Sequence, residues 1–334
     1  MLQLINQTGL PTQLFALPDP DGVDALHVIV KATFALTPDA PLAAAQAPVG
    51  MVDERVGEGA SAWLRRPSEL HPAKARCEVL LEGEAVAPRG RSVGSLDVTL
   101  SVGPWRRALR VTGDRRFTGR AEWFCTEPVP FTRMPLTPER AFGGCFAPEG
   151  ITDARNPAGA GFAPEGLRDL HALRDHRLPN IEDPEAPLRR PGDRPVPALV
   201  GPVAPSWSPR AERAGTYDDV WDRGRAPFLP TDFDPLFLQA APEAMWLPAR
   251  LVGAELITLR HLAEEPTVEA RVPSLGLRVR ARLRGEEREL RVEAETLHLF
   301  PGDGVATLTH RATLRCGHRP LDVASVEVTA EGIR

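Results

Sequence analysis

The sequence is short of lysine and cysteine, and it has no long basic run. Lys31 and Lys74 are the only lysines among 334 residues, so nearly all of the positive charge is arginine. The formal net charge is −5 and no long basic run occurs, which excludes the electrostatic footprint of a nucleic-acid-binding protein. The four cysteines include no Cys-x-x-Cys pair, so neither a zinc site nor a disulfide framework is indicated.

Long apolar runs are also missing. No run approaches the roughly 20 residues that a membrane-spanning helix needs. The N-terminus lacks the basic start and continuous apolar core of a secretory signal. With 42% hydrophobic and 25% charged residues, the composition is that of an ordinary globular protein. These observations predict a cytoplasmic protein with neither a membrane nor a nucleic-acid partner.

Motifs of common enzymes are absent as well. The sequence has no Gly-x-Ser-x-Gly elbow, no phosphate loop and no His-Glu-x-x-His helix. Asp183, Asp218 and Asp232 in the central loops allow an alternative, a carboxylate-dependent hydrolase or carbohydrate-active enzyme. Aspartates in such contexts are more often turn or cap acceptors. We therefore predict no catalytic residue and no cofactor, and keep the hydrolase as the alternative.

Eight histidines are present, and two of them suggest a metal site. His298 and His310 flank an expected turn, so they could face each other across a hairpin with Glu295 nearby. No third ligand with diagnostic spacing accompanies them, and histidines in sheets are more often structural. We predict no metal site, although binding near this pair stays open.

Strand signals fill both terminal parts of the chain. Runs rich in β-branched residues lie at 27–34, 77–87, 93–102, 108–112, 296–300, 305–314 and 321–329. Spacing near ten residues is typical of a sandwich, a barrel or a strongly curved sheet. We expect a mainly β protein with sandwich- or barrel-like sheets and few short helices. Its parts are an N-terminal β-rich region (1–130), a loop-rich central region (131–245) and a C-terminal β region (246–334), packed as one globular unit.

Two hairpins are expected in the C-terminal region. Residues 277–284 alternate apolar side chains with arginines, and the alternation resumes at residue 289. A turn at Glu286-Glu287 would place Arg284 opposite Glu289, in a salt-bridged, solvated face. Two glutamates are poor residues for so tight a turn, so a longer loop with shifted pairs remains an alternative. The second hairpin turns at 301–304, where Gly302 and Gly304 can supply positive φ.

The central stretch 139–243 is dominated by Gly, Pro, Asn and Asp, which predicts turns and loops. A loop this long is usually functional or disordered, and its many aromatic residues argue against disorder. Residues 178–209 carry nine prolines. We interpret them as an extended segment pinned across the protein, with a polyproline-like linker as the alternative.

Aromatic and arginine side chains in this stretch are of the types enriched in interface hot spots. Two of the candidates precede a pair of glycines that permits close backbone approach. The alternative interpretation is that the aromatic residues anchor the long loop to the β core. The predicted partner-binding candidates are Arg140, Phe142, Trp207, Arg210, Tyr217, Trp221 and Arg225.

Six short sequence motifs, taken in their order along the chain, resemble those of a known family. They are 139–144, 155–162, 178–184, 207–210, 214–218 with Trp221, and 225–234. They resemble domain of unknown function 2169, a bacterial family encoded beside type VI secretion effectors and viewed as effector adaptors or chaperones. The resemblance extends to 27–34, 113–116 and 134–136, and so covers most of the chain.

The resemblance implies a non-enzymatic adaptor or chaperone that binds a type VI secretion effector and helps load it onto the spike. The implied partners are the effector and a PAAR or spike protein. Recognition by an exposed strand edge would be one mode of binding. The family supplies no catalytic residues to carry over. An effector or immunity component of the same system is a further alternative.

Overall fold

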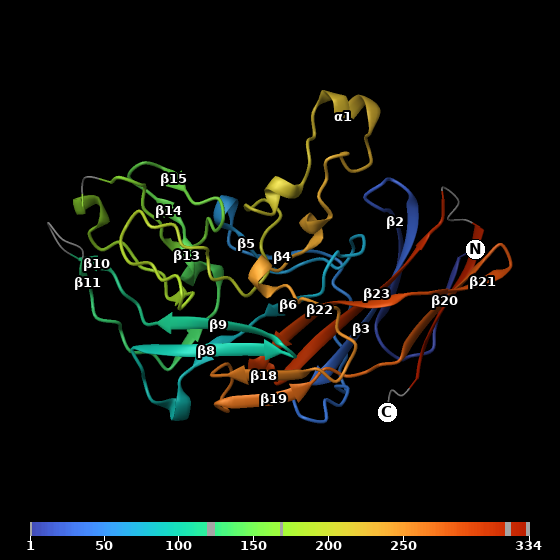
Figure 1. Ribbon diagram of the computed structural model, residues 1–334, viewed down its shortest axis with the longest axis horizontal. Coiled ribbons are helices and arrows are strands. Elements are labelled where there is room, and N and C mark those ends of the chain that lie inside the picture. The colour runs from blue at the N-terminus through green and yellow to red at the C-terminus, as the bar shows by residue number, and fades with distance from the viewer. Residues whose placement is uncertain (1, 119–123, 168–169, 318–321, 332–334) are drawn as a thin grey trace.

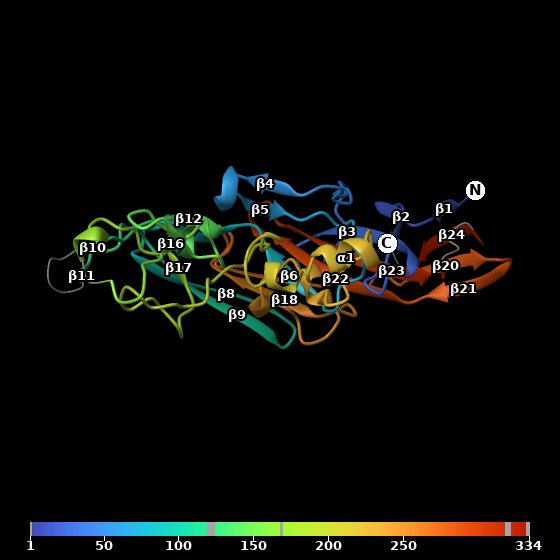
Figure 2. The ribbon, with the colours of Figure 1, turned by 90° about the horizontal axis from the view of Figure 1, so that it is seen from above.

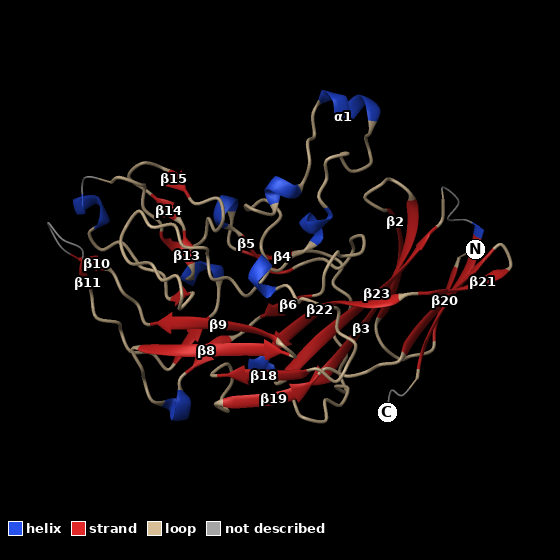
Figure 3. Cartoon of the chain, in the orientation of Figure 1, coloured by secondary structure: helices blue, strands red, loops and turns tan. Residues whose placement is uncertain are grey.

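The computed structural model describes residues 2–118, 124–167, 170–317 and 322–331 (Figure 1). These residues are mainly β, with one short α-helix and several 3-10 turns, which confirms the predicted fold class (Figure 3). The central sheet has five strands in the spatial order β2 (Thr12–Pro18), β3 (Asp24–Ala35), β23 (Val305–Arg315), β22 (Val292–Phe300) and β6 (Glu78–Leu81).

Two further sheets complete the frame, the name used here for the three large sheets together. One has the order β17 (Ile181–Glu182), β9 (Trp105–Thr112), β8 (Ser95–Val102), β18 (Leu256–Arg260) and β19 (Thr267–Arg271). The other has the order β1 (Gln3–Asn6), β24 (Val323–Ala330), β20 (Leu277–Leu283) and β21 (Glu286–Leu290). β1 and β24 pair in parallel, so the two ends of the described chain share one sheet.

One face of the central sheet packs against both of the other sheets. Phe34 and Leu299 belong to a core shared with the β8–β9–β18 sheet, whereas Val28 and Ala312 belong to a core shared with the β20–β24 sheet. Alternation along each strand places these apolar side chains on the same face. Figure 2 shows the resulting flat, elongated body, with the β20–β24 sheet at one end.

The opposite face of the central sheet is polar. In the sheet register, Thr33, Thr307 and His298 form one row across three strands. Lys31, Thr309 and Thr296 form the next row. The segment 47–74 covers these rows and leaves a cavity of about 290 Å³. The covering segment is tied to the sheet, because Lys31 pairs with its Glu69 at 2.9 Å.

Short elements make up the remaining secondary structure. The strands are β4 (Glu54–Val56), β5 (Trp63–Arg66), β7 (Glu84–Val86), β10 (Phe117–Thr118), β11 (Phe124–Cys125), β12 (Arg133–Pro135), β13 (Phe142–Gly143), β14 (Cys145–Phe146), β15 (Ile151–Thr152) and β16 (Ala160–Gly161). The helices are η1 (Gly59–Ser61), η2 (Pro88–Gly90), η3 (Pro138–Arg140), η4 (Leu170–Leu173), η5 (Ala211–Arg213), α1 (Asp219–Gly224), η6 (Pro235–Leu238), η7 (Glu243–Met245) and η8 (Pro301–Asp303).

The β20–β21 hairpin turns at Arg284-Gly285, so the predicted turn at Glu286-Glu287 is wrong. Both actual turn residues have positive φ, 53° and 85°, which a tight primed turn requires and which glycine adopts without strain. Arg280 therefore lies opposite Glu289. The strand that follows from Val292 leaves this hairpin and pairs with β23 and β6 instead.

The second predicted hairpin is confirmed as β22 and β23. Its turn is η8 followed by Gly304, which has a φ of 67°, whereas Gly302 does not adopt positive φ. The turn sets a register in which His298 lies opposite Thr307, and a register shift between Ala294 and Thr296 places His310 opposite Ala294. The two histidines therefore do not face each other, contrary to the prediction.

The proline-rich segment is extended and pinned, as predicted. The N–H of Leu81 in β6 donates to the carbonyl of Val200 at 2.9 Å. The N–H of Val203 donates to the carbonyl of Ala240 at 2.8 Å. Ala198 and Ala204 are 1% and 0% exposed, so this stretch is part of the core rather than a linker.

Candidate partner-binding surface

The seven candidate residues occupy three separate places rather than one cluster. Arg140 and Phe142 lie around β13, in the loop-rich part of the molecule. Trp207 and Arg210 lie just before η5. The other three, Tyr217, Trp221 and Arg225, lie in a segment that projects from the body (Figure 1).

Arg140 and Phe142 hold the loop region together. The Nη1 of Arg140 donates to the side-chain oxygens of Asp114 and Asn180, at 3.1 and 3.0 Å. Phe142 is 2% exposed, so a partner cannot contact this ring directly and would contact only the residues that surround it. It belongs to a third core cluster, which includes Phe117, Phe146 and Phe162.

The two glycines after Phe142 permit a close approach to the chain's own backbone. A Cβ on Gly143 would lie 2.3 Å from the carbonyl oxygen of Asn156, and one on Gly144 would lie 2.2 Å from that of Gly159. Both glycines have positive φ, 140° and 92°. The glycines therefore allow close contact with the neighbouring segment that contains Asn156 and Gly159.

Trp207 and Arg210 anchor the loop region to the frame. Trp207 is 1% exposed and lies in the large core. The Nε and Nη1 of Arg210 donate to the carbonyls of Phe237 and Val203, both at 2.7 Å. Burial lowers the pKa of Arg210, and the nearby carboxylate of Glu78 opposes that shift.

Residues 214–234 form the projecting segment, which we call the arm. At its base, the N–H of Asp234 donates to the carbonyl of Arg213 at 3.1 Å, and their side chains form an ion pair at 3.6 Å. Farther along, the carboxylate of Asp232 accepts from the N–H and the hydroxyl of Thr216, at 3.0 and 2.7 Å. The two limbs are thus cross-linked without forming a sheet.

Helix α1 forms the tip of the arm. Asp218 caps its N-terminus, because its Oδ1 accepts from the N–H groups of Val220 and Trp221 at 3.0 and 2.9 Å. The indole N–H of Trp221 donates to the carbonyl of Phe228 on the returning limb at 2.8 Å. These bonds give the tip a defined conformation.

Arg225 ties the arm to the body. Its Nε donates to the carbonyl of Leu229 at 2.8 Å, and its Nη2 donates to that of Pro20 at 3.2 Å. Pro20 lies in the turn between β2 and β3, so the arm leans on the central sheet. Trp221 and Arg225 therefore serve the structure of the arm itself.

Apolar side chains remain exposed at the tip. Tyr217 is 53% exposed, with its ring edge-on to Trp221 at a centroid distance of 4.7 Å. Val220, which the sequence did not single out, is 79% exposed. Tyr217 is thus the candidate that the structure leaves most available to a partner.

An apolar groove of about 310 Å³ lies at the foot of the arm. Trp246 and Val196, the latter 76% exposed, contribute apolar walls. Arg107, Arg155 and Arg213 line it and pair with Asp183, Asp153 and Asp234. The groove and the exposed tip together form the candidate partner-binding surface.

The carboxylates of the hydrolase alternative are engaged in structural bonds. Asp183 accepts from Arg107 at 2.7 Å and from the N–H of Glu185 at 2.9 Å. Burial raises the pKa of Asp183, but these two donors outweigh burial and lower it. Asp218 caps α1, and the Thr216 hydrogen bonds lower the pKa of Asp232. Neither Asp183 nor Asp232 therefore displays the raised pKa of a general acid.

Metal ligands do not gather anywhere in the described parts of the chain. Within them, no group of three or more His, Cys, Asp or Glu side chains could hold an ion. Burial lowers the pKa of His298 to about 3 and that of His310 to about 4.

The cysteines Cys77, Cys125, Cys145 and Cys316 are free thiols. Across the described residues, no helix is long and apolar enough to span a membrane.

Comparison with known proteins finds one matching family, which is bacterial. The model of a family described as an uncharacterized protein conserved in bacteria (DUF2169) matches residues 21–311. That match covers the arm, the groove and most of the frame. No curated protein and no solved structure matches the chain.

Proposed function

This chain belongs to the DUF2169 family, and we propose that it is a non-enzymatic adaptor or chaperone for a type VI secretion effector. In this proposal it works in the cytoplasm, binds the effector and helps load it onto a PAAR or spike protein. The phrases between residues 139 and 234 that resemble the family support this role.

The arm is the observation that carries the proposal. It presents Tyr217 and Val220 to solvent while internal bonds fix its conformation. A preformed apolar tip loses little conformational entropy on binding, which favours recognition of a protein partner. Tyrosine is also among the residues enriched in interface hot spots. The hydrolase alternative has no comparable support, because its carboxylates are bonded within the loops.

Strand β19 offers a second element for binding an effector. His261 and Pro266 form a hydrogen-bonded pair beside its start, and Glu255 and Val272 form one beside its end. Alternation in an antiparallel ladder then directs the backbone groups of Thr267, Glu269 and Arg271 away from β18. An extended effector segment can add to this edge. Proline at backbone positions of the effector that pair with β19 should then abolish binding, whereas conservative side-chain changes should not.

Capture from the producing bacterium tests the proposal. Tagged full-length protein is isolated with type VI secretion active, and its partners are identified by mass spectrometry. We expect one stoichiometric effector together with a PAAR or spike protein. Val220→Asp should lose the effector, whereas Val252→Asp, at a position 82% exposed outside the arm, should retain it.

A preparation that contains no effector, repeated under secretion-active conditions, contradicts the adaptor role. Activity screening against glycosides and esters would then follow. Equal capture by Val220→Asp and wild type would leave an adaptor whose binding surface is not the arm.

A further inference from the structure

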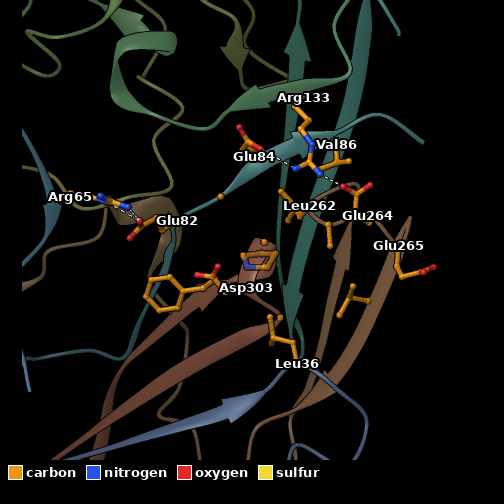
Figure 4. Close-up of a pocket in the computed structure, with 17 residues that line it drawn as sticks. Leu36, Arg65, Glu82, Glu84, Val86, Arg133, Leu262, Glu264, Glu265 and Asp303 are labelled. Atoms are coloured by element: carbon orange, nitrogen blue, oxygen red, sulfur yellow. Dashed lines mark hydrogen bonds and ion pairs between the residues drawn. The ribbon is translucent and has the colours of Figure 1, made fainter. Parts of the chain in front are cut away.

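Figure 4 shows the residues that line a cleft of about 750 Å³, which lies away from the arm, near the opposite end of β3. The arm contacts Pro20, before β3 begins, whereas Leu36, just past the end of β3, lines the cleft. Stretches that are distant in sequence form the walls, chiefly 82–86, 262–265 and 300–304, with Arg133 from β12. We call it the acidic cleft. Its volume is in the range of ligand-binding sites.

The floor of the acidic cleft is apolar. Leu36, Val86 and Leu262 line it and are 6%, 6% and 2% exposed. Val268 of β19 and Phe300 at the end of β22 extend the apolar lining and are only partly buried. A ligand seated here would remove the exposed parts of Val268 and Phe300 from water, at a gain of about 25 cal/mol per Å² of apolar area. The site therefore suits a ligand with apolar groups, not a bare ion.

The rim of the cleft carries more negative than positive charge. Two guanidinium groups face five carboxylates, namely Arg65 and Arg133 against Glu82, Glu84, Glu264, Glu265 and Asp303. Both arginines are already engaged. Arg65 pairs with Glu82 at 2.5 Å, and Arg133 bridges Glu84 and Glu264, as the dashed lines in Figure 4 show.

Two carboxylates of the cleft are left without a partner. Glu265 comes from the β18–β19 connection and Asp303 from η8, so they belong to different walls (Figure 4). Both are exposed, and neither takes part in an ion pair or a side-chain hydrogen bond within the described chain. A ligand that carries cationic groups beside apolar ones would match both the rim and the floor.

We propose that the acidic cleft docks a basic, apolar segment of the effector, in which lysine or arginine residues flank a buried apolar side chain. This inference rests on the proposed adaptor function and names the partner chemistry of a second site. The cationic groups would pair with Glu265 and Asp303 while the apolar side chain covers Val268 and Phe300. Polyanions such as nucleic acids would be repelled by the same rim.

A second copy of this chain is a poorer match for the cleft. An arginine-rich surface that it offers is the β20–β21 hairpin. There Arg278, Arg280 and Arg284 already pair with Glu331, Glu287 and Asp322. Those arginines would have to give up existing partners to enter the cleft, whereas an unpaired basic segment of an effector would not.

Charge reversal in the cleft tests the inference. The double variant Glu265→Lys with Asp303→Lys should reduce the captured effector on the order of tenfold, because two attractive pairs become repulsive. The matched control is Glu149→Lys, an exposed carboxylate in the β14–β15 turn, and it should capture the effector as wild type does. Unchanged melting temperatures would establish that both variants are folded.

A peptide array sharpens the test. Overlapping peptides that span the captured effector are probed with wild-type protein and with the double variant. Peptides that bind wild type and lose the variant should be positively charged and contain apolar residues, and raised salt should weaken their binding.

The outcomes separate the inference from the adaptor role. If wild type captures an effector and the double variant captures as much of it, the acidic cleft is not the docking site, although the adaptor role stands. Array peptides that bind through the cleft but are neutral or acidic would also overturn the inference. If wild type captures no effector at all, the adaptor role fails and the inference fails with it.

Discussion

The frame and the loop region between residues 139 and 243 bury their side chains in different ways. In the frame, alternation along strands delivers apolar side chains to the two cores between the sheets, Leu299 to one and Val28 to the other. In the loop region, side chains bond to backbone groups that no regular ladder satisfies. Asn156, for example, donates to the carbonyls of Pro138 and Phe142 at 2.8 and 3.0 Å.

This difference teaches where each region is vulnerable. A core of many apolar contacts distributes its stability over all of them, since each contact contributes little by itself. A loop held by a few specific hydrogen bonds depends on each of them. A buried carbonyl left without a donor lowers the free energy of unfolding by about 1–3 kcal/mol. Because a few buried hydrogen bonds hold the loops, their surface side chains remain available for binding.

The largest expected effect comes from the junction of the two regions at Glu78. This buried carboxylate of β6 accepts from Lys74, and its other oxygen accepts from Gln239 and the N–H of Ala241, both at 3.0 Å. Glu78→Ala should lower the free energy of unfolding by about 3–5 kcal/mol, because the charge of Lys74 would stay buried and unpaired. Urea denaturation measures the loss.

The exposed Glu58 provides the control for this variant, and Glu58→Ala should change stability by less than about 0.5 kcal/mol. A Glu78→Ala protein as stable as wild type would mean that the two regions are not joined through this carboxylate.

The next largest effect is a loss of stability of the frame at low pH. Burial, aided by the charge of Arg311, lowers the pKa of His27 in β3 from 6.5 to about 4. The unfolded chain therefore binds the proton first as the pH falls, and stability should decline between pH 6.5 and 4, on the order of 3 kcal/mol for this residue. His298 in β22 acts in the same direction, because burial lowers its pKa as well.

The measurement is the urea midpoint at intervals from pH 7.5 to 4. His27→Gln should flatten the dependence between pH 6.5 and 4. An identical slope in this variant and in wild type would show that His27 does not control the acid sensitivity of the frame.

A smaller loss is expected inside the loop region, at Asn180. Its Nδ2 donates to the carbonyl of Thr112 at 2.9 Å and to Asp114 at 3.0 Å, while its Oδ1 accepts from Arg140. Asn180→Ala should cost about 1–3 kcal/mol. Hydrogen exchange should show faster opening around Arg140 than around β3. Uniform acceleration across both regions would mean that the loops and the frame open as one unit.

The smallest effect on stability belongs to the tip of the arm. Val220→Asp should change the free energy of unfolding by less than about 0.5 kcal/mol, because the side chain is 79% exposed. Calorimetry of this variant beside wild type checks it. A larger loss would indicate that the arm is a structural support and would weaken its assignment as a binding surface.

Several features of the fold were predictable from the sequence because they depend on local patterns. The β-branched run at 27–34 lies within β3, and the turn before Val305 ends at a glycine with positive φ. The shift of the β20–β21 turn was the least accessible feature. Matching of apolar residues across the hairpin favours a turn at Glu286-Glu287, whereas in the observed register Leu283 lies opposite Glu286 and Ala281 opposite Arg288. The positive φ at Arg284 and Gly285 is the feature that favours the observed turn.

The candidate surface was predictable only in part. Tyrosine, tryptophan and arginine in a long loop are of the types enriched in interfaces, but the sequence does not say which of these side chains face the core. Trp207 proved buried and Tyr217 exposed, although both belong to the same stretch. Val220 carried no signal beyond its position in a short polar helix. Glu265 and Asp303 are 38 residues apart, so nothing local joins them.

Composition and periodicity alone determined a β-rich protein with a long structured loop region, because strands and turns have local signatures that survive without tertiary context. The tertiary structure decided which charges are neutralised and which remain free. Ion pairs and cleft walls form between segments distant in sequence, as where β12, η8 and the β18–β19 connection meet. Such meetings depend on how the sheets pack, and packing depends on the whole chain.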